Sequence, residues 1–218
     1  MGDFIQDCIR DGSLVMYHDY TSGCGLDWSG NDNHARFPPA PVFTGRGLRV
    51  FSVNPAQAIV APSIDLSNTP ACSMMWKLST IGEPFNTLIV MPSNWTVVTT
   101  SIFIGSVPVS TKRFQVTNKG NAGYNSWYTS NNGTPPRVIF GATFDKSQVG
   151  ANEVRGYIDG AVSGAAVATP NNTNNFGDHV PYMGKSSTTP CVCNIESVML
   201  FNRALTAEEH QTLYRELK

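Results

Sequence analysis

The loop from Asp27 to His34, D-W-S-G-N-D-N-H, carries the side chains best suited to metal chemistry. Asp27 and Asp32 supply carboxylate oxygens, which together with backbone carbonyls are the hard ligands that calcium prefers. The same residue types also favour tight turns, because Asp and Asn side chains bond the backbone two residues on and Gly allows positive φ. The loop therefore predicts either a calcium site, with calcium as the candidate cofactor, or hydrogen-bonded turn scaffolding.

A second stretch, from Asn118 to Thr134, is loop-like in composition and mixes aromatic with amide side chains. Aromatic rings can stack on the apolar face of a pyranose while amide groups bond its hydroxyls. The candidate glycan-contacting residues along the whole chain are Trp28, Trp95, Tyr124, Asn125, Trp127 and Tyr128. A hairpin in which Trp127 only covers the edge of a sheet explains the same pattern.

The cysteines are odd in number and irregularly spaced, which favours free thiols made in a reducing compartment. They are Cys8, Cys24, Cys72, Cys191 and Cys193. Cys191 and Cys193 fall on one face of a strand, but no second Cys or His pair stands at the spacing of zinc ligands. A zinc site is therefore not predicted.

Composition and charge exclude several classes of function. The chain of 218 residues has 15 Lys and Arg against 16 Asp and Glu and no basic cluster, so no nucleic-acid partner is expected. The sequence contains no run of about 18 apolar residues, which membrane insertion of a helix would need. The acidic start M-G-D-F-I-Q-D fits neither a signal peptide nor a myristoylation site. With 14% charged residues, 19 Gly and 14 Pro, the composition predicts one domain of short strands.

The elements that position these loops are expected to be strands, with a helix at each end. Residues 1–13 contain apolar side chains at helical spacing between Asp3 and Arg10, which predicts a short N-terminal helix or arm. This arm would pack on its own domain or dock on a neighbouring subunit. At the other end, a buried strand beginning at Ile195 gives way after Asn202 to a helical period.

The C-terminal helix has a marked start, because Thr206 followed by Glu209 forms a capping box. His210, Leu213, Tyr214 and Leu217 then fall on one helical stripe that is expected to be buried against the body of the domain.

The run E-S-V-M-L-F-N-R-A-L-T-A-E-E-H-Q-T-L-Y, from Glu196 to Tyr214, resembles the closing signature of LamG-like jelly-roll domains. These domains belong to the concanavalin A-like lectin/glucanase superfamily. The Asp27 loop is also similar to that family's "D-x-S-G-N-x-N-H-G", with Ala35 where Gly is usual. Cys72 to Leu78 resembles its central strand, and Asp159-Gly160 lies in a hairpin that resembles its "V-D-G" turn.

The resemblance implies an all-β fold, a two-sheet antiparallel β-sandwich (jelly roll), in which residues 14–218 form a single domain. Glucanases of that superfamily carry two catalytic glutamates close together on one strand, and no glutamates here have that spacing. No G-x-S-x-G, P-loop or dinucleotide motif is present either. The chain is therefore not expected to be an enzyme.

The leading functional hypothesis is a structural and binding module on a phage virion, as a head decoration or tail component. It rests on a single domain without export signal, linker or membrane anchor. The protein would be made in the host cytoplasm, and its partners would be other virion proteins, further copies of itself and cell-surface glycans. The alternative is a carbohydrate-binding, lectin-like module that depends on calcium if the Asp27 loop holds the ion.

Overall fold

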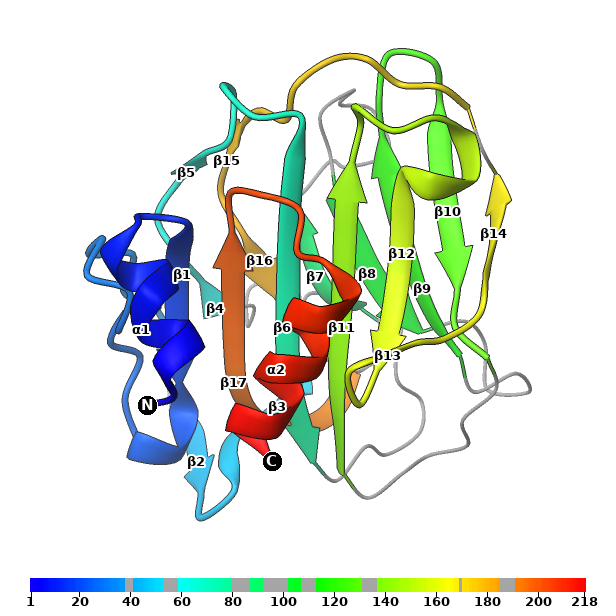
Figure 1. The fold of residues 1–218 in the computed structure, drawn as a ribbon. Coiled ribbons are helices and arrows are strands. Elements are labelled where there is room, and N and C mark those ends of the chain that lie inside the picture. The colour runs from blue at the N-terminus through cyan, green and yellow to red at the C-terminus, as the bar shows by residue number, and fades with distance from the viewer. Residues whose placement is uncertain are drawn as a thin grey trace.

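Two antiparallel sheets stack face to face, and the helices α1 (Asp3–Arg10) and α2 (Ala207–Leu217) lie on one of them (Figure 1). This computed structural model describes residues 1–37, 41–52, 59–79, 87–91, 102–106, 113–130, 137–168, 170–184 and 191–218. The expected all-β sandwich with a short helix near each end is confirmed.

The first sheet has β6 (Ala71–Ser79) near its middle, between β11 (Arg137–Asp145) and β17 (Cys191–Phe201). Its order is β13 (Ala161–Val162), β12 (Val154–Ile158), β11, β6, β17, β3 (Gly47–Ser52) and β2 (Val42–Thr44), and β1 (Leu14–Asp19) also pairs with β17. The predicted central strand from Cys72 to Leu78 is confirmed as β6. The hairpin turn at Asp159-Gly160 is confirmed too, because both residues have the positive φ, 50° and 81°, that such a tight turn requires.

The second sheet lies behind the first and contains the predicted aromatic stretch. Its order is β14 (Ala165–Ala168), β10 (Tyr124–Tyr128), β9 (Phe114–Lys119), β8 (Ile102–Ser106), β7 (Thr87–Met91), β16 (Tyr182–Met183) and β4 (Ile59–Val60). A separate pair joins β5 (Ile64–Asp65) to β15 (Asp178–His179). Most of the segment expected to be loop-like, from Asn118 to Thr134, is a β9–β10 hairpin with its turn at 120–123, where Gly120, Asn121 and Gly123 lie, and residues 131–134 fall outside the described residues.

The core between the sheets is built from alternate residues of the central strands. Trp76 on β6 is fully buried, as predicted, and its ring centroid lies 6.0 Å from that of Phe140 on β11. Phe140 also stacks on Phe114 of β9, at 4.4 Å between centroids, so aromatic contacts cross from one sheet to the other. Each of these large side chains contributes about 1.5–3 kcal/mol through burial.

The outer face of the first sheet has its own apolar cluster, which the two helices cover. Met75, Ile139 and Met199 point outward from β6, β11 and β17, and Leu213 of α2 and Ile5 of α1 pack on this layer. The carboxylate of Glu216 in α2 accepts hydrogen bonds from the backbone N–H groups of Phe4, at 2.8 Å, and Ile5, at 3.3 Å. The N-terminal helix therefore packs on its own domain.

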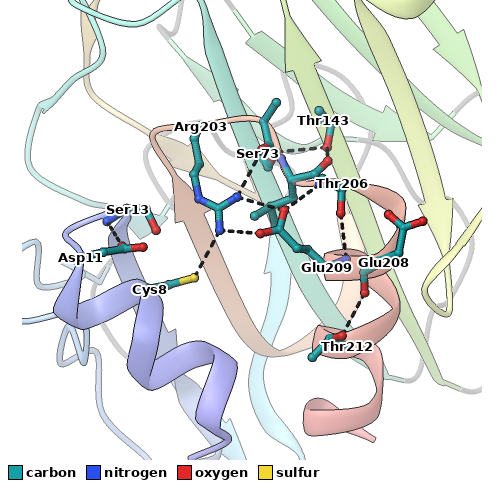
Figure 2. A network of polar contacts seen from close by, with 12 residues as sticks. Cys8, Asp11, Ser13, Ser73, Thr143, Arg203, Thr206, Glu208, Glu209 and Thr212 are labelled. Atoms are coloured by element: carbon teal, nitrogen blue, oxygen red, sulfur yellow. Dashed lines mark hydrogen bonds and ion pairs between the residues drawn. The ribbon is translucent and has the colours of Figure 1, made fainter.

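Arg203, between β17 and α2, joins both helices to the sandwich. The capping box is present as predicted: Thr206 Oγ1 accepts from the Glu209 backbone N–H at 3.2 Å, and Glu209 Oε2 accepts from that of Thr206 at 2.8 Å. Figure 2 shows Arg203 donating to both carboxylate oxygens of Glu209, at 2.9 and 2.8 Å, and to Cys8 Sγ at 3.7 Å. The N-R-A-L-T-A-E-E run is therefore structural, because it clamps the helix start to its neighbours.

Candidate functional site

The loop that begins at Asp27 is held together by the Asp27 carboxylate. Oδ1 accepts from the backbone N–H groups of Tyr17, at 2.8 Å, and Ser29, at 3.0 Å. Oδ2 accepts from Ser29 Oγ at 2.8 Å and from the Asn33 backbone N–H at 2.9 Å. The side chain is buried, so its oxygens already have four donors inside the turn. Hydrogen-bonded scaffolding is thus the role that the geometry supports for Asp27.

Asp32 lies in the same loop but points into solvent, with 93% of its side chain exposed. Its φ of 58° places it at a left-handed turn, and its carboxylate lies 3.7 Å from the His34 ring nitrogen Nε2. Across the described ranges, no group of three or more His, Cys, Asp or Glu side chains is gathered as a metal cluster. Calcium binding at Asp27 and Asp32 stays a prediction.

The predicted glycan residues of β10 divide between the two faces of its sheet. Asn125 and Trp127 point inward, and both are buried. Trp127 packs in the main core, and its indole N–H donates to the Ser163 carbonyl at 2.8 Å. A ring enclosed in this way has no free face for a sugar.

Asn125 belongs to a buried amide cluster around Glu153, which the sequence did not predict. The Glu153 carboxylate accepts from the side-chain amides of Asn118, at 2.9 Å, Asn125, at 3.2 Å, and Asn172, at 2.7 Å, and from the Asn172 backbone N–H at 3.2 Å. The Lys146 ammonium lies near this cluster, and desolvation by burial lowers its pKa to about 8. A buried carboxylate so fully hydrogen-bonded is a structural element of the domain interior.

The outward-facing residues of β9 and β10 form a polar and aromatic surface, here called the β9–β10 face. It comprises Gln115, Thr117 and Lys119 of β9 with Tyr124, Ser126 and Tyr128 of β10. Tyr124 is 39% exposed, and the Lys119 ammonium lies 5.1 Å from its ring centroid.

Between the two tyrosines of this face runs a short chain of hydrogen bonds. Gln115 Nε2 donates to Thr117 Oγ1 at 3.1 Å, and the hydroxyls of Thr117 and Ser126 lie 3.0 Å apart. Tyr124 and Tyr128 therefore each lie two positions along β10 from Ser126, whose hydroxyl is held by its hydrogen bond to Thr117.

Trp28 does not join this face in the structure. Trp28 is 46% exposed, but its segment follows β1, at the opposite side of the sandwich from β10 (Figure 1). Trp95 lies outside the described residues. Among the predicted glycan residues that the structure describes, Tyr124 and Tyr128 share an outward surface.

Sequence reasoning missed a polar hollow on the outer face of the first sheet, here called the arginine pocket. It has a volume of about 460 Å³ and is lined by Thr21, Gly45, Arg46, Lys77, Ser79, Arg137 and Glu196. Arg137 Nη2 donates to Glu196 Oε2 at 2.8 Å, and Lys77 Nζ lies 3.6 Å from the same oxygen. The sequence alone does not indicate the strand register that brings these side chains together.

The described glutamates have structural surroundings rather than a catalytic pairing. Glu153 is enclosed by amides, Glu196 is paired with two cations, and Glu209 and Glu216 cap helices. Glu208 adds charge to the first turn of α2. His210 is buried against Tyr157, with its Nε2 at 2.8 Å from Thr143 Oγ1. This arrangement is compatible with a chain that is not an enzyme.

Comparisons with known proteins bear on the fold. No protein-family model matches the sequence, and no curated protein matches it. Among solved structures, the botulinum neurotoxin serotype G binding domain is similar at 15% identity and a TM-score of 0.70, covering 94% of this chain and 51% of that one. The serotype C1 binding domain is similar at 14% identity and a TM-score of 0.68, covering 96% and 53%. The likeness therefore shows a shared β-sandwich, and this chain spans about half the length of those domains.

A third similar structure is the binding domain of botulinum neurotoxin DC in complex with SialylT. It is 15% identical, with a TM-score of 0.67, over 96% of this chain and 52% of that chain. In the ranges that the structure describes, no helix has both the length and the apolar character needed to cross a bilayer.

Proposed function

We propose that this chain is a non-catalytic carbohydrate-binding module, of the LamG-like kind that its closing motif resembles, and that it holds a glycan on the β9–β10 face. The observation that carries the proposal is the outward placement of Tyr124 and Tyr128 beside Gln115 and Lys119. Phenol rings offer apolar area to the C–H face of a pyranose, while the amide and ammonium groups donate to its hydroxyls.

The similar toxin domains support a binding role, since one is in complex with SialylT and another, from botulinum neurotoxin type C, concerns cell entry that depends on interaction with two ganglioside molecules. A third is in complex with rat synaptotagmin II, a protein partner. Within the ranges described, neither helix lies on the second sheet, because α1 and α2 both pack on the first. The hydroxyls of Thr117 and Ser126 are buried in the β9–β10 face, so a ligand would contact chiefly the rings of Tyr124 and Tyr128, the Gln115 amide and the Lys119 ammonium.

A glycan array probed with the full chain tests this function. The variant carrying Tyr124→Ala and Tyr128→Ala should lose most of the signal, because each ring that stacks on a sugar contributes about 1 kcal/mol or more. Trp28→Ala is the matched control, since it removes an exposed aromatic ring from the other side of the sandwich. Loss of binding in the Trp28 variant alone would move the site to the Asp27 loop and refute the β9–β10 assignment.

Calcium enters the same experiment as a separate arm. Repeating the array with a chelator, and with Asp32→Asn, tests whether the Asp27 loop supports binding through an ion. Absence of any signal with and without calcium would refute the carbohydrate-binding function itself.

The role on a phage particle, as head decoration or tail component, is a second proposal and concerns where the module acts. It is compatible with glycan binding, because a surface protein of a particle can also hold cell-surface sugars. Cosedimentation of the purified protein with heads or tails of the phage that encodes it would support this role. A monomer that binds neither kind of particle would contradict it.

A further inference from the structure

We propose that the arginine pocket binds the carboxylate of an acidic sugar, such as a uronic or sialic acid residue. That the ligand is a sugar rests on the proposed glycan-binding function. That the ligand carries a carboxylate is inferred from the residues that line the pocket. The pocket lies on the first sheet and is therefore separate from the β9–β10 face.

The charges of the lining residues favour an anion. Arg46, Lys77 and Arg137 contribute three positive charges, and Glu196 contributes one negative charge. Glu196 accepts from Arg137 and lies near Lys77 through one oxygen, Oε2, so these two cations share a single carboxylate. The exposed Arg46 guanidinium makes no ion pair within the part of the chain that the structure describes. The lining therefore has a net charge of +2, which one carboxylate ligand would lower to +1. Guanidinium groups bind carboxylates through two parallel hydrogen bonds.

An unpartnered hydroxyl inside the pocket points to a ligand independently of the charges. Ser79 is 2% exposed, and its Oγ has no hydrogen-bond partner among the residues that the structure describes. A buried polar group without a partner is costly, so a hydroxyl in this position is suited to a bound polar molecule. Ser79 is the last residue of β6 and pairs with Arg137 of β11, and its buried hydroxyl is part of the lining of the pocket.

The polar character of the lining favours a sugar over an acidic peptide. All the described lining residues are charged, hydroxyl-bearing or glycine, and an aromatic or aliphatic side chain is not among them. The hydroxyl of Thr21, one of the lining residues, donates to the Asp19 carboxylate at 2.5 Å, so its oxygen still has acceptor capacity. A hydroxyl-rich ring carrying one carboxylate matches such a surface, and a volume of about 460 Å³ is within the range of small-ligand sites.

The pocket is preorganised by the turn between β2 and β3. Thr44 Oγ1 accepts from the Arg46 backbone N–H at 3.2 Å and donates to the Gly47 carbonyl at 3.0 Å. Gly47 has a φ of 99°, and a Cβ there would clash with the Ile195 carbonyl oxygen. The turn thus packs directly on the backbone next to Glu196, where a bulge in β17 shifts its register against β6. Rigid placement of Arg46 and Glu196 lowers the entropic cost of binding.

The test is a titration of the full chain, followed by NMR, with glucuronic acid and N-acetylneuraminic acid and with their methyl esters. At least one acid should bind at least about tenfold more tightly than its ester, as expected for a charge-assisted contact. Arg137→Gln and Arg46→Gln should each remove most of that preference. Arg46→Gln gives a test in which loss of folding is not expected, because Arg46 makes no ion pair within the described ranges. Arg10→Gln, on the exposed face of α1, is the control and should bind as the wild type does.

The outcomes separate this inference from the proposed function. Glycan binding without preference for the acid, or a preference lost only in the Tyr124 and Tyr128 variants, would overturn the pocket while leaving the function intact. Acetate or inorganic sulfate binding as tightly as the sugar acids would also overturn it, since the sugar would then add nothing. No binding of any glycan would overturn both proposals.

Discussion

Acidification should destabilise this protein through His210, which is buried in neutral form under α2. Its ring stacks on Tyr157 with centroids 3.7 Å apart, and it lies so close to β11 that a Cβ on Gly141 would be 2.7 Å from Nδ1. Desolvation by burial lowers the pKa of His210 from 6.5 to about 3, opposed only by the charge of Glu209. Below pH 6.5 the unfolded chain therefore binds a proton that the folded chain does not, and stability falls until about pH 3.

These two pKa values fix the size of the effect. At pH 5 the unfolded state gains about 2 kcal/mol from protonation of this one imidazole, relative to pH 7.5. Urea unfolding at pH 7.5 and pH 5 should therefore show that wild type loses about 2 kcal/mol more than His210→Gln over this interval. Burial also lowers the pKa of His18, but that histidine is present in both proteins and cancels from the comparison.

A control is needed because any change under α2 destabilises the domain. Leu213→Val removes a buried methylene from the same layer, at a cost of about 1 kcal/mol, without removing a titrating group. Its pH dependence should match that of wild type. Equal losses for wild type and His210→Gln between pH 7.5 and 5 would refute the burial of a neutral imidazole at this position.

Three further substitutions probe the framework, each followed by urea unfolding. Glu153→Gln should cost about 2 kcal/mol or more, because its new N–H group would face the donors of Asn118 and Asn172; a smaller loss would mean that these amides can reorient. Gly47→Ala should cost about 2 kcal/mol, since it adds both a clash and a strained φ, whereas Gly45→Ala, in open space, is the control. Glu209→Ala should cost about 1 kcal/mol and speed hydrogen exchange in the first turn of α2, and unchanged exchange there would contradict the capping role.

Local signals in the sequence predicted the fold well. The capping box at Thr206 and Glu209 and the turn at Asp159-Gly160 depend on residues three or fewer positions apart, and both are confirmed. The central strand containing Trp76 was predicted from the resemblance of Cys72 to Leu78 to the central strand of LamG-like domains. Such features need no knowledge of which strands are neighbours.

Surfaces assembled from several strands could not be predicted in this way. Lys77, Arg137 and Glu196 meet because Arg137 pairs with Ser79 in the sheet and because β17 bulges between Ile195 and Ser197. A shift of one residue would turn each side chain to the other face, and nothing in the sequence specified that register.

The same limit explains the aromatic stretch of β10. The sequence grouped Asn125 and Trp127 with Tyr124 and Tyr128, but strand alternation separates the two pairs. The inward position of Asn125 depends on Glu153, a residue 28 positions away that supplies its acceptor. Because amide side chains usually lie on outward faces, the sequence pattern favoured a surface role for Asn125, whereas the structure pairs it with the buried Glu153.

The two proposed sites lie on outer faces of different sheets, and this separation predicts independent binding. Stacked sheets are about 10 Å apart, and side chains add to that distance, so a monosaccharide cannot reach both faces. When substitutions of Tyr124 and Tyr128 are combined with substitutions of Arg46 and Arg137, the changes in binding free energy should therefore add. Isothermal titration with a short acidic oligosaccharide should reveal two sites per chain, each abolished by its own pair of substitutions. Strong coupling between the pairs would mean that one ligand contacts both groups of residues, and the assignment of two separate faces would then be wrong.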